Sequence, residues 1–251
     1  MSRKIFVVTA AYGHDRVRQA GGQCAMLPVI AAAGADGVEI RREMFNEQEQ
    51  TDLAALAVAI TEHQLLACYS APEPLYLADG ALNPLLPDLL REARTLNALW
   101  LKVSLGHFTD SQTLQTLRSW LATGGVRLVV ENDQTACGQL PPMQRFSAAC
   151  QVQDLPVMLT FDMGNWLWVD SSPEQAARHL APFVSYIHVK AATPQQNGYR
   201  AIAPDEGGSR WQALLRALPG DVPRGIEFPL EGDDLTAVTR RYVELLREEE
   251  A

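Results

Sequence analysis

The sequence contains few cysteines, and they form no recognisable binding pattern. The four cysteines are Cys24, Cys68, Cys137 and Cys150, and no two of them are spaced as C-x-x-C. So few cysteines in 251 residues argue against a disulfide framework and against a zinc knuckle. We therefore expect small buried thiols in a reducing compartment.

Long hydrophobic runs and basic clusters are also missing. No apolar stretch reaches the ~18 residues that a helix needs to span a bilayer. The opening MSRKIFVVTAAYG has two basic residues and a short apolar run, which indicates a first strand rather than a signal peptide. The formal net charge is −9, and no Lys/Arg-rich segment offers a surface to a phosphate backbone. These absences predict a cytoplasmic protein that binds neither membrane nor nucleic acid, and they leave a homo-oligomer open.

What the sequence does contain is a regular alternation of two patterns. Short runs rich in β-branched residues are followed by turns, and then by stretches whose apolar residues recur every three or four positions. Such helical stretches include 52–64, 85–98 and 234–250. The predicted strands cover 5–10, 37–41, 65–72, 99–106, 127–132, 156–165, 184–191 and 224–230.

Strands that alternate with helices pair in parallel, because each crossover connection uses a helix. Eight such units in 251 residues predict the α/β class and a (β/α)8 TIM barrel. An open doubly wound sheet would carry a G-x-G-x-x-G loop after its first strand, and TAAYGHDRVRQAGG does not match that motif. No linker or low-complexity segment divides the chain, so we expect a single domain over residues 1–251.

Metal-capable side chains stand at the carboxyl ends of the last four predicted strands, where barrels place their chemistry. They are Glu131, Asp162, His188 and Glu227. Alternation along a strand places His188 on the same face as Tyr186, and the larger aliphatic residues on the other. We therefore expect the four side chains to face the barrel axis. For each residue alone, the alternative is a strand-end group that caps the next helix.

Carboxylates crowded into one barrel mouth repel each other and lose hydration, a cost that a divalent cation removes. Three oxygen donors and one imidazole favour Mn²⁺, with Mg²⁺, Co²⁺ or Zn²⁺ as alternatives. The sequence therefore predicts one divalent metal ion as the cofactor.

Further polar residues are predicted to face the lumen or to follow a strand. Glu39, Arg41, Lys102 and Lys190 are candidate substrate-binding residues, and the three cations favour an anionic substrate such as a sugar acid. The alternative for Glu39 is a structural ion pair with a basic neighbour. His107 follows the fourth strand and is a candidate loop acid or base, with a helix cap as the alternative.

The order of several motifs resembles a known family, the xylose isomerase-like TIM barrels. The motifs are VVEN at 129–132, FDMGN at 161–165, IHVK at 187–190, PDEGGSRW at 204–211 and IEFPL at 226–230. That family includes sugar and sugar phosphate isomerases, ketose 3-epimerases, inosose dehydratases and, within its AP endonuclease family 2 superfamily, endonuclease IV. The resemblance covers essentially the whole chain.

The resemblance implies a single metal held by Glu131, Asp162, His188 and Glu227. In the epimerase branch, the two glutamates also remove and return a proton at the carbon next to a carbonyl, and the metal favours the enediolate. Asn165 stands where many members have a histidine. We expect its side chain to bind a substrate hydroxyl, since an amide cannot shuttle a proton at neutral pH.

The leading hypothesis is a metal-dependent isomerase or epimerase that acts on a small sugar or sugar acid. A dehydratase of the same fold begins with the same proton abstraction, so the sequence leaves it open. An endonuclease-IV-like nuclease and a non-catalytic ligand-binding barrel are further alternatives, with less support from the residues present.

Overall fold

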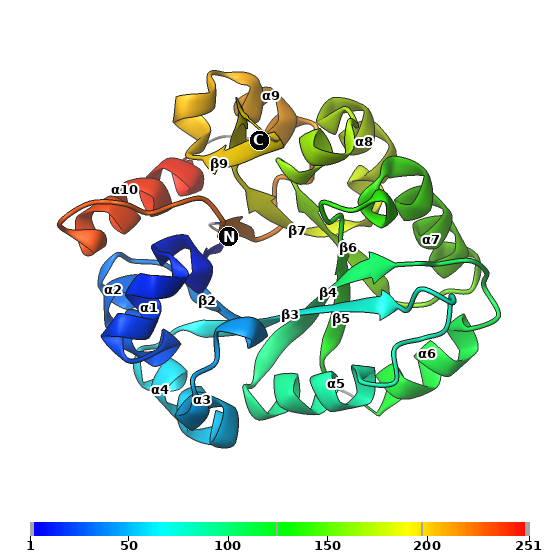
Figure 1. The fold of residues 1–251 in the computed structure, drawn as a ribbon, viewed down its shortest axis with the longest axis horizontal. Helices are drawn as coiled ribbons and strands as arrows, with labels where there is room; N and C mark the ends of the chain where they lie inside the picture. Colours follow the sequence, from blue (N-terminus) through cyan, green and yellow to red (C-terminus); the bar gives the residue numbers. More distant parts are fainter. Residues whose placement is uncertain (1–2, 124, 197, 249–251) are drawn as a thin grey trace.

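The fold was obtained as a computed structural model that describes residues 3–123, 125–196 and 198–248 (Figure 1). Eight parallel strands within these residues close into a barrel in the order β1-β10-β7-β6-β5-β4-β3-β2. This confirms the predicted (β/α)8 TIM barrel. The strands are β1 (Ile5–Val8), β2 (Gly37–Arg41), β3 (Leu66–Tyr76), β4 (Ala98–Gly106), β5 (Arg127–Glu131), β6 (Val157–Asp162), β7 (Val184–Val189) and β10 (Arg224–Ile226).

Helices form a ring around the barrel, as Figure 1 shows. The α-helices are α1 (His14–Ala20), α2 (Leu27–Ala32), α3 (Glu47–Thr51), α4 (Leu53–Glu62), α5 (Leu86–Thr95), α6 (Leu114–Ala122), α7 (Leu140–Val152), α8 (Pro173–Leu180), α9 (Arg210–Arg216) and α10 (Leu235–Glu248). Short 3-10 helices are η1 (Thr9–Tyr12), η2 (Gln23–Met26), η3 (Arg42–Met44), η4 (Ala136–Gly138), η5 (Asn165–Val169), η6 (Ala181–Phe183) and η7 (Pro204–Gly207). Among the described helices, none combines the length and the apolar character required to cross a membrane.

The three helical stretches named from the sequence correspond to α4, α5 and α10, each within a few residues of its predicted ends. The final residues of the stretch predicted at 234–250 lie outside the described part of the chain.

Several strand ends differ from the predicted ones. β1 ends at Val8 because the next four residues turn into η1, and β10 ends at Ile226 rather than at residue 230. β3 instead continues to Tyr76, beyond the predicted end at residue 72. Its pairing with β4 shifts register between Ser70 and Pro74, and such an irregularity accommodates prolines that a regular ladder would exclude.

An antiparallel hairpin follows β7 and was not predicted. It consists of β8 (Ala191–Gln195) and β9 (Gly198–Ile202). Its strands are short and mix small, polar and apolar residues, so they carry neither a long apolar run nor a clear alternation. The ring of Tyr199 on β9 packs on Trp168 in η5, with 5.4 Å between the ring centroids. This contact ties the hairpin to the loop that follows β6.

The core has an inner and an outer layer, and strand alternation separates them. On β7, Ile187 and Val189 belong to the large outer cluster between barrel and helices, whereas Tyr186 belongs to a small inner cluster. That inner cluster also contains Phe6 and Trp100, whose ring centroids are 5.3 Å apart. Aromatic rings therefore fill part of the lumen, and the polar residues follow toward the carboxyl ends of the strands.

Candidate metal centre

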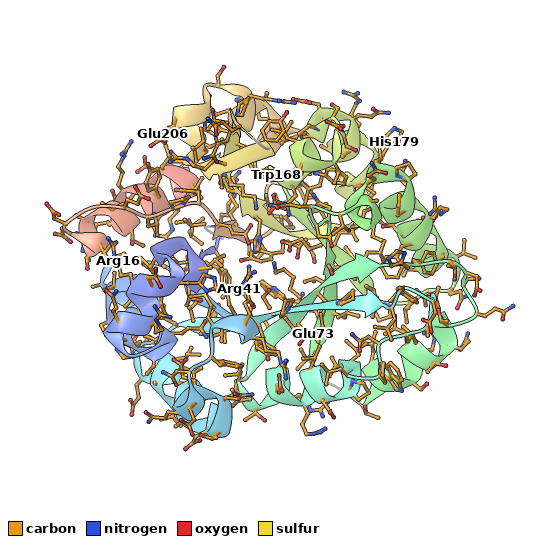
Figure 2. The ribbon with its side chains drawn as sticks, viewed as in Figure 1. Arg16, Arg41, Glu73, Trp168, His179 and Glu206 are labelled. Atoms are coloured by element: carbon orange, nitrogen blue, oxygen red, sulfur yellow. The ribbon has the colours of Figure 1, made fainter. Side chains whose placement is uncertain are left out.

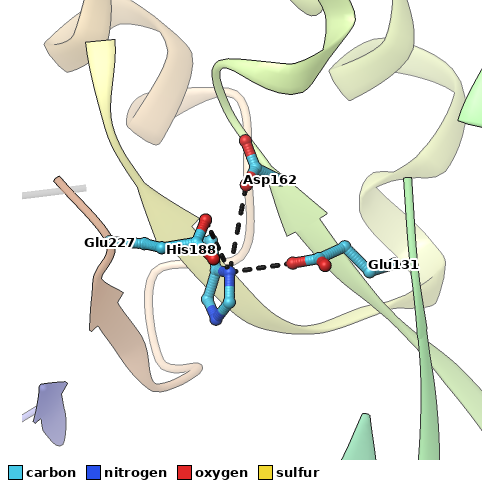
Figure 3. A group of neighbouring side chains, drawn as sticks. All are labelled: Glu131, Asp162, His188 and Glu227. Atoms are coloured by element: carbon cyan, nitrogen blue, oxygen red, sulfur yellow. Dashed lines mark ion pairs between the residues drawn. The ribbon is translucent and has the colours of Figure 1, made fainter. Parts of the chain in front are cut away.

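Four side chains converge where β5, β6, β7 and β10 end. Each of Glu131, Asp162, His188 and Glu227 offers one donor atom, and these atoms all lie within 4.8 Å of one another. Figure 3 shows the three carboxylates around the imidazole of His188. Its Nδ1 atom lies 2.8 Å from Glu131 Oε1, 3.1 Å from Glu227 Oε2 and 3.9 Å from Asp162 Oδ2. The structure thus brings together the four residues that the sequence singled out.

The backbone around Asp162 determines which of its oxygens faces the cluster. Oδ1 accepts hydrogen bonds from the backbone N–H groups of Gly164 and Asn165, both at 2.9 Å. Asn132, at the end of β5, donates from Nδ2 to the Asp162 carbonyl and accepts the Asp162 N–H on Oδ1. These contacts hold the carboxylate in place and leave Oδ2 directed at Lys190 Nζ, 2.7 Å away, and His188 Nδ1, 3.9 Å away.

Three donor atoms of the cluster are buried without a regular hydrogen bond. Glu131 Oε1, Asp162 Oδ2 and His188 Nδ1 form none with the described residues, although Asp162 Oδ2 is ion-paired with Lys190 Nζ at 2.7 Å and His188 Nδ1 lies 2.8 Å from Glu131 Oε1. Only ionic contacts join these buried donor atoms, and a cation between them would give all three a shared partner. Oxygen atoms and one imidazole nitrogen are donors that divalent cations accept. The residues present therefore fit a divalent cation.

Three cationic side chains surround the cluster and pair with its carboxylates. Lys102 Nζ lies 2.7 Å from Glu131 Oε2, and Lys190 Nζ lies 2.7 Å from Asp162 Oδ2. The Lys102 and Lys190 side chains are only 2% and 7% exposed, so both lysines hold carboxylates from inside the barrel. Both ammonium groups are paired with cluster carboxylates in the structure, and their contact with a substrate stays a prediction.

Arg41 differs from the two lysines because it reaches the opening. Its side chain is 19% exposed, and its Nη1 atom lies 3.0 Å from Glu227 Oε1. Its Nε atom donates to Glu43 at 2.8 Å. Figure 2 shows Arg41 near the middle of the molecule, whereas His179 lies at the periphery.

Burial and charge shift the pKa values of the cluster in opposite directions. Burial raises the pKa of Asp162 to about 7, in spite of the neighbouring Lys190 ammonium. Burial lowers the pKa of His188, but the carboxylates of Glu227 and Glu39 outweigh it and hold that pKa well above its usual value. Burial also raises the pKa of Glu131, and there Lys102 and His188 outweigh it, so the pKa falls below normal. The cluster therefore retains protons that a cation would displace.

The structure also places the three other residues that the sequence predicts to bind substrate. Glu39 is fully buried, with its Oε2 atom 2.7 Å from His188 Nε2 and its Oε1 atom 3.5 Å from Lys102 Nζ. Asn165 uses both ends of its side chain within the loop, since Nδ2 donates to Asn132 O and Oδ1 accepts from Gln134. His107 is exposed after β4, and the described residues show no contact between its side chain and the four ligands.

Two glycines matter to the site, and sequence reasoning did not identify them. A Cβ atom on Gly225 would lie 2.3 Å from Tyr186 Oη and 3.0 Å from His188 Cδ2. A Cβ atom on Gly164 would lie 2.9 Å from Cγ of Lys190, whose side chain passes over it. Neither glycine has a left-handed backbone, so no turn motif marks it in the sequence. Only the approach of distant side chains reveals these two requirements.

A cavity of about 720 Å³ opens beside the cluster, between the loops that follow β1 and β10. Glu227 forms part of its wall, together with Tyr12, His14, Arg16 and Ala201 of β9. The side chains of Glu131 and Glu227 are 13% and 16% exposed, whereas those of Asp162 and His188 are fully buried. A small molecule that enters the mouth would therefore meet the two glutamates first.

Comparison with known proteins supports the fold. No family model matches the sequence, and no curated protein does either. Solved structures do match over nearly the full length of both chains. A xylose isomerase domain-containing protein from Salmonella typhimurium LT2 is 13% identical, with a TM-score of 0.72 and 97% of each chain covered. A D-allulose 3-epimerase from Methylomonas sp., solved in complex with D-allulose, is 14% identical, with a TM-score of 0.65 and coverage of 99% of this chain and 98% of that one.

A probable 3-DHS dehydratase from Bacillus anthracis is 11% identical, with a TM-score of 0.66 and coverage of 97% of this chain and 98% of that one. At such identities the likeness shows the fold alone. The predicted resemblance to the xylose isomerase-like TIM barrels is therefore confirmed for the fold.

Proposed function

We propose that this protein is a divalent-metal-dependent isomerase or epimerase that acts on a small sugar or sugar acid. In this proposal Glu131, Asp162, His188 and Glu227 hold one metal ion, with Mn²⁺ preferred over Mg²⁺, Co²⁺ or Zn²⁺. Glu131 and Glu227 also move the proton next to the substrate carbonyl.

One observation carries the proposal, namely the convergence of four metal-capable donor atoms at the barrel mouth. Four side chains from strands far apart in the sequence place their donor atoms within 4.8 Å of one another. A purely structural network would join these atoms to each other through regular hydrogen bonds, because buried polar groups are nearly always satisfied. Here three of the atoms form none within the described part of the chain and make only ionic contacts. The arrangement supports a cation as their shared partner.

The chain's own residues account for how a proton could move. Glu131 and Glu227 are the two ligands whose side chains reach the opening, so a substrate carbon can approach both carboxylates. Lys102 orients Glu131 through Oε2, and Arg41 and Lys190 orient Glu227 through its two oxygens. When bound, a divalent cation supplies Lewis-acid polarisation of the substrate's carbonyl and hydroxyl oxygens. Glu131 is proposed to remove the proton from one face of the carbon, and Glu227 to deliver one from the other.

The substrate is proposed to be small and polyhydroxylated, with Arg41 as the group that selects an acid. Nε and Nη1 of Arg41 face Glu43 and Glu227. A guanidinium has five N–H donors in a fixed fork, so its Nη2 edge is available to a carboxylate or a hydroxyl. The two lysines are less suited to this role because the cluster carboxylates occupy them. A clear preference for neutral sugars over sugar acids would contradict the proposed role of Arg41.

The experiment that tests this function is a substrate screen in D₂O. Purified protein loaded with Mn²⁺ is incubated with ketoses and keto sugar acids, and carbon-bound deuterium is followed by NMR. We expect deuterium at the carbon next to the carbonyl of the true substrate, and no incorporation by protein stripped of metal. If no compound in a broad panel exchanges with the loaded protein, or if the stripped protein exchanges equally well, the proposed function is wrong.

A dehydratase is the second candidate, because one of the similar folds is a probable dehydratase. Both reactions begin with proton removal beside a carbonyl, so the same glutamate would act first. Mass spectrometry of the product separates the two, since dehydration loses water and isomerisation or epimerisation does not.

A further inference from the structure

Glu39 occupies the middle of the barrel lumen on the far side of the imidazole from the cluster. It lies on β2, across the barrel from β7, and its side chain is 1% exposed. Strand alternation directs it inward, where its register partner on β3 is Cys68. It is thus shielded from the opening by His188 and its neighbours, and a substrate in the mouth would not reach it.

The contacts of Glu39 are concentrated on one oxygen. Oε2 lies 2.7 Å from His188 Nε2 and accepts a hydrogen bond from the Tyr186 hydroxyl at 3.0 Å. Oε1 forms no hydrogen bond with the described residues, and its neighbours are Lys102 Nζ at 3.5 Å and Arg41 Nη1 at 3.7 Å. The best-formed contact of this carboxylate is therefore with the ring that faces the cluster.

A carboxylate accepts hydrogen bonds only, so the Nε2 atom of His188 must carry a proton in this contact. In a neutral imidazole with Nε2–H, the remaining lone pair belongs to Nδ1. Nδ1 is the atom that points at Glu131 and Glu227 and lacks a hydrogen bond. The Nε2 edge of the ring is thus held by Glu39, and the Nδ1 edge points at the cluster.

The space around the ring is shaped for this orientation. Tyr186 and His188 pack edge to face, with ring centroids 4.9 Å apart. Gly225 on the neighbouring strand β10 pairs with His188 in register and leaves room for both rings. An imidazole turned over by 180° would place Cε1 instead of Nε2 next to Glu39 and would lose this hydrogen bond.

We propose that Glu39 is a positioning residue that holds His188 with its proton on Nε2 and so presents Nδ1 to the metal ion. This inference rests on the proposed function, because it assumes that a cation binds at the cluster. A carboxylate that hydrogen-bonds the second nitrogen of a ligating histidine fixes its tautomer and raises its basicity, and losing such a partner typically weakens metal binding 10–100-fold. If Glu39 only balanced the charge of Lys102, its loss would leave the proton position on His188 unchanged.

The test compares wild-type protein with Glu39→Gln and with Glu92→Gln as a matched control. Glu92 on α5 also accepts a hydrogen bond from a tyrosine, Tyr69, and pairs with an arginine, Arg42, but it does so outside the lumen. Mn²⁺ affinity is measured by titration calorimetry. We expect Glu39→Gln to weaken Mn²⁺ binding by about 10–100-fold and Glu92→Gln by less than about threefold.

A second measurement needs no variant. In full-length, ¹⁵N-histidine-labelled wild-type protein loaded with Zn²⁺, NMR should show the His188 proton on Nε2 and none on Nδ1. The inference is overturned if the proton resides on Nδ1, or if Glu39→Gln binds Mn²⁺ as tightly as wild type. Should Glu39→Gln fail to fold, the NMR result on wild type decides. Wild-type protein that binds neither ion would refute the proposed function as well, and the wild-type titration alone would show it.

Discussion

Replacing Gly225 with alanine tests whether the lumen is shaped around the Tyr186–His188 pair. The added Cβ atom would lie 2.3 Å from Tyr186 Oη and 2.9 Å from Tyr186 Cζ, where ordinary contacts begin at 3.4 Å. Gly225 is buried on a barrel strand paired with β7, so its backbone has little freedom to retreat. We expect the overlap to push the tyrosine away from Glu39 and to disturb the His188 ring.

The cost follows from overpacking a rigid interior. Insertions of this kind destabilise proteins by about 1–3 kcal/mol. In a chain of this size, each kcal/mol lowers Tm by about 2–4 °C. Gly225→Ala should therefore lower Tm by about 2–12 °C in a calorimetric scan. It should also weaken Mn²⁺ binding, because a Cβ atom at residue 225 approaches His188 Cδ2 to 3.0 Å.

A double-mutant cycle identifies the overlap as the cause. Tyr186→Phe removes the nearest atom, so it should relieve part of the strain that Gly225→Ala introduces. We expect the double variant to be more stable than the sum of the two single losses implies, by at least about 1 kcal/mol. Strictly additive losses, or a Gly225→Ala protein as stable as wild type, would refute the explanation.

Three further predictions concern the cluster itself. Mn²⁺ at a hundred times its dissociation constant should stabilise the protein by about 2.7 kcal/mol, and EDTA should reverse the rise in Tm; a Tm that does not respond to Mn²⁺ would contradict the metal site. The raised pKa of Asp162, about 7, means that its native state without metal binds a proton that the unfolded chain releases near its ordinary pKa. The contribution of Asp162 to stability is thus complete at low pH and is lost as pH rises through about 7, which denaturant titrations of wild type and Asp162→Asn at several pH values check. Mn²⁺ affinity should rise over the same pH interval, which calorimetry checks. Glu131→Gln should lower the rate of deuterium incorporation by about 10²–10⁴-fold in protein that remains folded by circular dichroism, and an unchanged rate would exclude Glu131 as a base.

The sequence was sufficient to predict the barrel because each strand–helix unit carries its own local signal. A two-residue alternation distinguishes the two faces of a strand, and on β7 it placed His188 with Tyr186 inside and Ile187 with Val189 outside. Parallel strands bring their carboxyl ends to one face of a barrel. The convergence of polar strand ends therefore followed from topology and parity, without knowledge of any distance.

Local patterns were less informative where pairing or packing is irregular. The extension of β3 depends on a register shift against β4, which no property of β3 alone reveals. The strands of the hairpin, β8 and β9, mix small, polar and apolar residues without alternation, and the contact between Tyr199 and Trp168 joins segments that are distant in the sequence. The ends of β1 and β10 were predicted too late in the sequence, because where a strand stops pairing depends on the segment that follows it in space.

The sequence by itself determined the fold class, the inward face of several strands and the set of candidate ligands at the strand ends. The tertiary structure alone decided which charged side chains form ion pairs or hydrogen bonds with each other. It placed Lys102 and Lys190 in ion pairs inside the lumen, Arg41 at the opening and Glu39 against the far side of His188. The physical reason is that periodicity is a local property of the backbone, whereas a hydrogen bond or an ion pair depends on distances of a few ångströms between side chains on different strands.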